Sequence, residues 1–164
     1  MDRYSTHLNL MTKVFQYKNI ETALEFGMGN FSTNFLIENT KSKVTSIEMQ
    51  YEEWFNDIYS KFSINPKWNG ILSLGPNDFQ NLKYESKYDF VLVDGHGDTR
   101  PECVNFSSNF CDTIIAHDTE AEHVYGWSRV NLPNFYTLED RNQEPWTKVW
   151  TKDEALIKFL SENL

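Results

Sequence analysis

Glycines and carboxylates follow apolar runs at several points of the sequence, and these residues are the ones best suited to chemistry. The first such stretch is TALEFGMGNFS, which holds Glu25, Gly27 and Gly29. Glycine suits a sharp turn and lets a ligand approach the backbone closely, because it carries no side chain. The stretch therefore indicates either a tight strand-to-helix connection or a turn that wraps a nucleotide-like ligand.

Acids also end three later apolar runs. Glu48 closes KVTSIE, Asp94 closes YDFVLVD and Asp118 closes DTIIAHD. An acid at the end of the second strand of a nucleotide-binding sheet accepts hydrogen bonds from ribose hydroxyls, which is the role expected for Glu48. The carboxylates of Asp94 and Asp118 are the hard oxygen ligands that a divalent cation needs. The structural alternative is that Asp94 bonds turn amides and Asp118 caps the next helix.

Two histidines and one arginine lie next to these two aspartates in the sequence. His96 and His117 carry imidazoles whose ordinary pKa lies near neutrality, so with the aspartates they form a candidate catalytic cluster. Arg100 could pair with a substrate carboxylate or with Asp98. His7 is expected to belong to an opening helix rather than to bind a ligand.

Alternating strands and helices must position these residues. Such alternation indicates βαβ units, and hence an α/β fold with a largely parallel sheet. Unbroken apolar runs such as VLV indicate strands covered on both faces. Ligands of open sheets of this kind sit beyond the carboxyl ends of the strands, where the acids are predicted. The expected strands are 22–26, 43–49, 68–75, 88–95, 112–118, 134–142 and 146–151, and the expected helices include 5–17, 50–62, 101–110, 121–130 and 153–160.

A chain of 164 residues suits one domain with a proper core. We expect residues 1–19 to supply an N-terminal helix, 20–150 the core sheet and 151–164 a C-terminal helix. Thr151 and Glu154 have the spacing of a capping box at the start of this last helix. Cys103 and Cys111 are too few for a disulfide framework, so two buried thiols are expected.

The charge and the apolar runs exclude several classes of partner. The formal net charge is −9 and the pI about 4.9, which opposes binding to nucleic acid. No apolar run approaches the roughly 20 residues of a membrane helix, so no membrane partner is expected. The first residues lack the apolar core of a secretory signal, and we expect a cytoplasmic protein.

The charge next to the glycine turn discriminates between nucleotide-like ligands. A dinucleotide brings a pyrophosphate, which favours a helix N-terminus with no adjacent acid. S-adenosylmethionine brings a cationic sulfonium and an amino group, so Glu25 beside the glycines favours this ligand. The third glycine of the dinucleotide pattern G-x-G-x-x-G is also missing, because Ser32 occupies its position.

EFGMGNFS, VTSIEM and YDFVLVDG together resemble motifs of the class I S-adenosylmethionine-dependent methyltransferases, in the same order over residues 20–150. This resemblance implies a Rossmann-like, doubly wound, seven-stranded sheet with an antiparallel last strand. It implies that the methionine part of the cofactor contacts the glycine turn, that Glu48 holds the ribose, and that Met49 packs on the adenine. The cofactor-binding residues expected in this way are Glu25, Gly27, Gly29, Ser32, Glu48, Met49, Gly75 and Asp78.

VDGHGDTR with IIAHDTE resembles the metal-dependent O-methyltransferases that act on small molecules such as catechols and sugars. In these relatives, acids after the fourth and fifth strands ligate Mg²⁺, which implies Asp94 and Asp118 as metal ligands. His117 stands where some relatives carry a second carboxylate, which suggests a softer metal ion. We expect O-methylation of a small-molecule acceptor, with a homo-oligomer as one way to complete the pocket. The alternatives are a non-catalytic S-adenosylmethionine-binding module and an NAD-linked oxidoreductase.

Overall fold

One sheet of seven strands organises the chain, which a computed structural model describes over residues 5–75 and 77–164. The strands are β1 (Thr22–Phe26), β2 (Lys43–Glu48), β3 (Trp68–Leu72), β4 (Phe90–Val93), β5 (Thr113–His117), β6 (Tyr136–Asp140) and β7 (Thr147–Thr151). Their order is β3-β2-β1-β4-β5-β7-β6. β1 to β5 are parallel, while β7 is antiparallel to both of its neighbours. The predicted mostly parallel sheet with an antiparallel last strand is confirmed.

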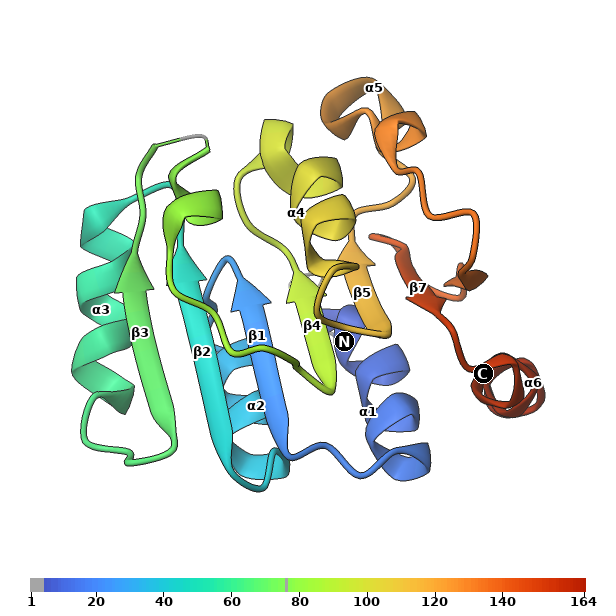
Figure 1. Cartoon of the computed structure of the whole chain (residues 1–164), viewed down its shortest axis with the longest axis horizontal. Helices are drawn as coiled ribbons and strands as arrows, with labels where there is room; N and C mark the ends of the chain where they lie inside the picture. The colour runs from blue at the N-terminus through green and yellow to red at the C-terminus, as the bar shows by residue number, and fades with distance from the viewer. Residues whose placement is uncertain (1–4, 76) are drawn as a thin grey trace.

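Helices cover both faces of the sheet (Figure 1). They are α1 (His7–Tyr17), α2 (Ser32–Asn39), α3 (Glu52–Phe62), α4 (Arg100–Ser107), α5 (Glu122–Tyr125) and α6 (Glu154–Asn163), with short 3₁₀ turns η2 (Asp78–Asn81), η3 (Gly97–Thr99) and η4 (Trp127–Arg129). α1, α2, α3 and α6 pack on one face, and α4 packs on the other. Because β1 to β5 are parallel, their carboxyl ends share one edge of the sheet, the upper edge in Figure 1.

Alternate residues of the central strands serve two separate cores. In β4, Phe90 and Leu92 face the core built with α1, α2 and α6, whereas Val91 and Val93 face the core built with α4. All four side chains are fully buried. Burial of such a side chain is worth about 1.5–3 kcal/mol, so both faces of this strand must be apolar. This explains why the run FVLV shows no polar alternation.

Two local predictions need correction. Thr151 ends β7, and the N-cap of α6 is Asp153, whose carboxylate accepts a hydrogen bond of 3.1 Å from the amide of Leu156. The capping box is therefore wrong. The predicted helix 121–130 is divided between α5 and η4, because Gly126 adopts the left-handed φ of +67°. Residues 1–4 of the predicted N-terminal helix lie outside the described residues.

Two further expectations concern the cysteines and membranes. Cys103 and Cys111 are both buried free thiols, as predicted. Among the helices of the described residues, none combines the length and the apolar character needed to cross a membrane.

Candidate active site

Two loops meet at the carboxyl edge of the sheet, one after β1 and the other after β4. Gly27 has a φ of +86°, a left-handed conformation that glycine adopts without strain. A Cβ at Gly27 would lie only 2.4 Å from the carbonyl oxygen of Asp94 and from Cα of Gly95. The amide of Asp94 also donates a hydrogen bond of 2.8 Å to the carbonyl of Phe26. Glycine at position 27 is therefore what allows the two loops to touch.

Glu25 supports the glycine turn from inside the sheet. Its side chain is 0% exposed, and Oε2 accepts a hydrogen bond of 2.7 Å from the hydroxyl of Thr33. The Thr33 oxygen in turn accepts a hydrogen bond of 3.0 Å from the amide of Gly29. Burial raises the pKa of Glu25 to about 7, against the opposing effect of nearby hydroxyls. Glu25 lines neither of the cavities described below.

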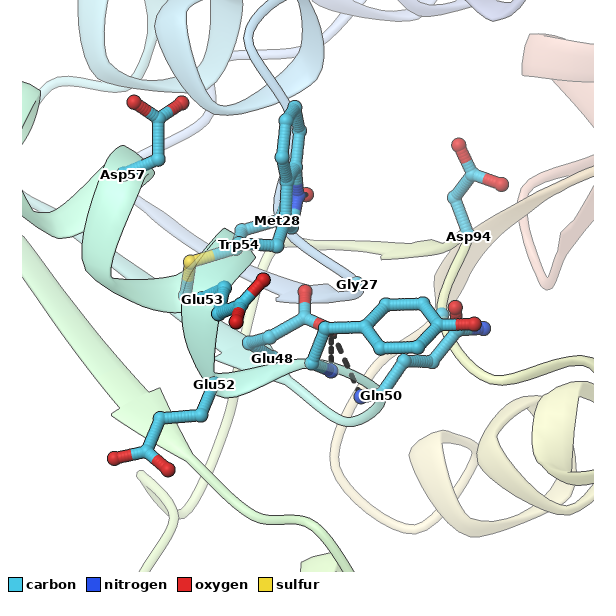
Figure 2. Close-up of a pocket in the computed structure, with 11 residues that line it drawn as sticks. Gly27, Met28, Glu48, Gln50, Glu52, Glu53, Trp54, Asp57 and Asp94 are labelled. Atoms are coloured by element: carbon cyan, nitrogen blue, oxygen red, sulfur yellow. Dashed lines mark hydrogen bonds between the residues drawn. The ribbon is translucent and has the colours of Figure 1, made fainter.

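A cavity of about 1010 Å³ opens between the glycine turn and α3 (Figure 2). The indole N–H of Trp54 donates a hydrogen bond of 2.7 Å to the carbonyl of Met28, which ties α3 to the turn. Glu48 accepts hydrogen bonds at Oε1 from the amides of Gln50 (2.8 Å) and Tyr51 (3.2 Å). Oε2 of Glu48 has no hydrogen-bond partner among the described residues. The lining residues are Gly27, Met28, Glu48, Gln50, Tyr51, Glu52, Glu53, Trp54, Asp57, Asp94 and Gly95.

Carboxylates dominate this first cavity. Five of its lining residues are acids, and none of the described lining residues is lysine, arginine or histidine. Glu52 and Asp57 come from α3, and Asp94 lies on the opposite side (Figure 2). The resulting negative potential attracts a cationic ligand and opposes a pyrophosphate.

A second cavity of about 630 Å³ adjoins the first. Asp94 lines both cavities and therefore lies where they meet. Met28, Gln50 and Trp54 are also shared. The remaining lining residues are His7, Gly29, Asn30, Phe31, Ser32, Arg100, His117, Asp118, Tyr125 and Pro145. The titratable side chains of this second list come from α1, α4, α5 and the end of β5.

Arg100 links the two aspartates of the second cavity. Nη2 lies 3.0 Å from Oδ1 of Asp94, and Nη1 lies 2.7 Å from Oδ2 of Asp118. The guanidinium also lies 4.4 Å from the ring centre of Tyr125, whose hydroxyl donates to Asp118 at 3.2 Å. The predicted pairing of Arg100 with Asp98 is wrong, because the guanidinium is buried and points inward. Its charge is already matched by two carboxylates, which argues against the predicted role in binding a substrate carboxylate.

This arrangement fixes the charge of Asp94. Burial alone would raise the pKa of this carboxyl, but Arg100 and then His117 outweigh burial and hold the pKa at about 2. Asp94 is therefore ionised at neutral pH. Asp118 adopts a φ of +60°, an uncommon backbone conformation that is found at functional sites.

His117, the last residue of β5, lies between Asp94 and α1. Nδ1 is 3.4 Å from Oδ2 of Asp94, and Nε2 is 2.8 Å from the hydroxyl oxygen of Thr6. That hydroxyl donates its single proton to the carbonyl of Pro145 at 2.8 Å, so Nε2 of His117 must be the donor toward Thr6. Burial lowers the pKa of His117, but the hydrogen bond and the charge of Asp94 outweigh burial and raise this pKa above its ordinary value, so the protonated ring, with Nδ1 donating toward Asp94, is favoured.

Sequence reasoning missed His7, the first residue of α1. Its side chain is 1% exposed, and its ring centre lies 4.9 Å from that of His117. Neither ring nitrogen has a hydrogen-bond partner among the described residues. Burial lowers the pKa of His7 to about 4, so the imidazole is neutral at pH 7. The available signal was position: residue 7 continues the buried stripe of α1 formed by Leu10, Met11 and Val14.

Comparisons with known proteins give matches only at the level of structure. No family model matches the sequence, and no curated protein matches it. An O-methyltransferase from Bacillus cereus in complex with SAH superposes with a TM-score of 0.69 at 17% identity, over 93% of this chain and 82% of its own. An O-methyltransferase of tomaymycin synthesis from Streptomyces achromogenes, in complex with SAM, gives 0.65 at 12%, over 93% and 81%. The chain has the class I methyltransferase fold.

A spermidine synthase from Thermotoga maritima shares this methyltransferase fold as well. It superposes with a TM-score of 0.64 at 13% identity, over 96% of this chain and 61% of its own. The fold alone therefore does not determine the activity, which must be argued from the two cavities.

Some of the predicted cofactor residues line the two cavities of this methyltransferase fold, and the others do not. Gly27 and Glu48 line the first cavity, while Gly29 and Ser32 line the second. The other four line neither cavity: Glu25, described above, Met49, which is buried with its sulfur against Gly95, and Gly75 and Asp78, which follow β3. Their predicted contacts with the cofactor have no support from these cavities. Residues that sequence reasoning missed here include Gln50, Tyr51 and Trp54.

Three of the four predicted catalytic residues line the second cavity. Asp94, His117 and Asp118 are brought together as expected. His96 lines neither cavity, although its Nδ1 is buried and has no hydrogen-bond partner among the described residues. His7 is a second histidine that lies beside His117 and lines the second cavity.

The magnesium site expected at Asp94 and Asp118 does not fit this structure. Mg²⁺ requires near-ideal octahedral oxygen ligands at about 2.1 Å. Arg100 already bridges the two carboxylates and supplies the positive charge between them. Nδ1 of His117 lies 3.4 Å from Asp94 and 3.8 Å from Asp118, and it offers nitrogen rather than oxygen.

Proposed function

We propose that the protein is an S-adenosylmethionine-dependent methyltransferase that methylates a hydroxyl group of a small molecule. The observation that carries this proposal is the pair of adjoining cavities that meet at Asp94, one lined by carboxylates and the other by the His117–Arg100 cluster. The structural similarity to O-methyltransferases solved with SAH or SAM supports it.

The first cavity suits the cofactor. Its volume of about 1010 Å³ lies at the upper end of the range for small-molecule sites. The free Oε2 of Glu48 can accept a hydrogen bond from a ribose hydroxyl, and Tyr51 and Trp54 offer aromatic surface to an adenine. The acids stabilise the cationic sulfonium and oppose the pyrophosphate of NAD, so the oxidoreductase alternative is disfavoured.

The second cavity suits the acceptor. S-adenosylmethionine, held in the first cavity, would supply the methyl group and leave as S-adenosylhomocysteine, and the residues shared by the two cavities would hold the acceptor oxygen toward it. The hydroxyl proton leaves toward the imidazole–carboxylate cluster beside Asp94. The main contribution expected of the chain is to hold both reactants in one orientation, on either side of the residues that line both cavities.

Calorimetric titration of the full chain with S-adenosylhomocysteine and, in parallel, with NAD tests the cofactor. We expect binding of S-adenosylhomocysteine only, and weaker binding by Glu48→Gln. The matched control is Glu38→Gln, which removes an exposed acid of α2 that lines neither cavity. Binding of NAD alone would overturn the proposal.

Release of methyl groups from S-adenosylmethionine to pooled phenols, sugars and amines then tests catalysis. We expect transfer to a pool that carries hydroxyl groups. Cofactor binding without transfer to any pool would instead favour the non-catalytic binding module.

A further inference from the structure

One buried imidazole at the second cavity has no role in the function proposed above. His7 is 1% exposed, and neither of its ring nitrogens has a hydrogen-bond partner within the described part of the chain. Buried polar groups are nearly always paired, because an unpaired one loses its bonds to water and gains nothing in return. Since His7 lines the second cavity, a ligand that enters there can supply the missing partner.

The second cavity has an exposed mouth and a buried inner end. The exposed residues of its lining are Asn30, Phe31 and Gln50. His7 belongs to the buried end, where one of its ring nitrogens lies within 4.8 Å of a carboxylate oxygen of Asp94. Asp94 is the residue at which the two cavities meet. An acceptor whose reacting hydroxyl lies beside Asp94 therefore brings its neighbouring atoms to His7.

The charged side chains that line the described part of this cavity balance one another. Arg100 lies 3.0 Å from Asp94 and 2.7 Å from Asp118. His117 lies 3.4 and 3.8 Å from the same two carboxylates, and its raised pKa favours the protonated ring. Two negative groups thus face two positive groups. A charged group of an acceptor would lose its water here without finding a free counter-ion.

His7 offers hydrogen-bonding groups without adding charge. Burial lowers the pKa of His7 to about 4, so its ring is neutral at pH 7. A neutral imidazole has one N–H donor and one nitrogen that accepts. A hydroxyl can bond to either nitrogen, whereas a carboxylate can only accept and an ammonium group can only donate. The position is therefore suited to a hydroxyl.

We propose that His7 selects the acceptor by binding an uncharged hydroxyl group other than the one that is methylated. The acceptor is accordingly a neutral compound with at least two hydroxyl groups, and acids and amines are poor substrates. This inference rests on the proposed methyl transfer and gives it a substrate class. A site built to bond a hydroxyl rejects an analogue without that hydroxyl, because the group of the protein is then left unpaired.

Methyl transfer from labelled S-adenosylmethionine to matched acceptors tests the charge preference. One set is glucose, glucuronate and glucosamine, and the other is hydroxybenzyl alcohol, hydroxybenzoate and hydroxybenzylamine. We expect kcat/KM for a neutral member to exceed kcat/KM for its charged counterparts by about tenfold or more. Equal or faster transfer to a charged member would overturn the proposal.

Variants of His7 combined with shortened acceptors test the residue itself. His7→Leu removes both nitrogens, and we expect kcat/KM for the neutral acceptor to fall about 10–100-fold. Cresol lacks the second hydroxyl of hydroxybenzyl alcohol, and deoxyglucoses lack single hydroxyls of glucose. The analogue without the selected hydroxyl should react slowly with the unmodified chain and lose little more in His7→Leu. Equal losses with the complete and the shortened acceptor would show a merely structural role and overturn the assignment.

Two further variants complete this comparison. His7→Gln again offers one donor and one acceptor, and it should recover part of the lost kcat/KM. His123→Leu removes an exposed histidine of α5 that lines neither cavity, and it should leave kcat/KM unchanged. If His7→Leu does not fold, the unmodified chain decides, and equal kcat/KM for the complete and all shortened acceptors would contradict the proposal.

The same assays separate this proposal from the proposed function. Transfer to acceptors without regard to their charge or second hydroxyl would remove the selectivity and leave the methyl transfer standing. Absence of transfer to every acceptor would remove the methyl transfer, and the selectivity with it. Titration of His7→Leu with S-adenosylhomocysteine should give the affinity of the unmodified chain, because His7 does not line the first cavity.

Discussion

At the scale of single residues, Arg100 is the main electrostatic element of the site. It is buried and holds Asp94 and Asp118 together at 3.0 and 2.7 Å. Burying charges is costly unless each is paired, and a guanidinium can serve two carboxylates at once through its fork of donors. In this chain, an arginine therefore provides the positive charge that the resemblance had assigned to a divalent ion.

Replacing this arginine should destabilise the chain strongly. Arg100→Met leaves two carboxylates without their cation, and we expect the free energy of unfolding to fall by about 3–5 kcal/mol. Urea denaturation measures the change. Arg129→Met, which removes a half-exposed arginine paired with Glu102, is the control and should cost less than about 1 kcal/mol. Equal effects of both variants would contradict a central role for Arg100.

Glu25 gives stability a pH dependence of defined sign. Burial raises its pKa from 4.5 to about 7, so the folded chain binds this proton more tightly than the unfolded chain. The stabilisation is complete below pH 4.5 and is lost as the pH rises through 7, by about 3 kcal/mol in total. Glu25→Gln keeps the shape and removes the titration.

The difference between the unmodified chain and Glu25→Gln isolates this effect. Unfolding free energies measured from pH 4.5 to 8 should fall more steeply for the unmodified chain. The exposed Glu38→Gln should follow the unmodified chain at every pH. Parallel curves for the unmodified chain and Glu25→Gln would show that Glu25 keeps an ordinary pKa.

At the scale of elements, the loop after β1 is defined by backbone contact rather than by side chains. Gly27 meets the backbone of Asp94 and Gly95, and it needs a positive φ. Gly29 has more space, since a Cβ there would lie 3.2 Å from the hydroxyl oxygen of Ser32, which can rotate away. The two glycines of the motif are therefore not equivalent.

Alanine substitutions should separate these two glycines. Gly27→Ala combines a strained φ with a backbone clash, and we expect a loss of about 3 kcal/mol or more in unfolding free energy. Gly29→Ala should cost less than about 1 kcal/mol. Thermal denaturation and titration with S-adenosylhomocysteine measure both, with binding lost in the first variant and largely kept in the second. Equal tolerance at the two positions would refute this account of the turn.

At the scale of the whole molecule, the proposed cofactor site joins segments that are distant in the sequence. Its lining residues follow β1, β2 and β4 and include the first turns of α3. A ligand that binds only the folded chain must therefore stabilise all of these segments together. At about 100 times its Kd, S-adenosylhomocysteine should add about 2.7 kcal/mol.

This stabilisation should raise the Tm by about 5–10 °C for a chain of this size. Differential scanning calorimetry with S-adenosylhomocysteine measures the shift, and NAD at the same concentration is the control. A shift of equal size with NAD would contradict the charge argument for the first cavity.

The sheet was largely predictable from the sequence, because its strands leave a local signal. FVLV and TIIAH are apolar without alternation, which requires cover on both faces and hence helices between strands. The ends of helices were less predictable. Thr151 and Asp153 both have capping side chains, and only the pairing of β7 with β5 decides between them.

The candidate site was predictable where it depends on strand ends, and not where it depends on packing. Asp94 and His117 meet because β4 and β5 are neighbours, which the sequence order already suggested. His7 reaches them only because α1 packs behind these strands, a contact that no local pattern encodes. The inward turn of Arg100 likewise follows from the start of α4, which was expected one residue later.

The contact between Gly27 and the Asp94–Gly95 backbone has a consequence for how two ligands would bind. No side chain separates the two loops at this point, so their backbones are in direct contact. A methyl donor seated against the first loop would also fix the carboxylate carried by the second. Donor and acceptor should thus bind with positive cooperativity, each raising the affinity for the other by the same factor.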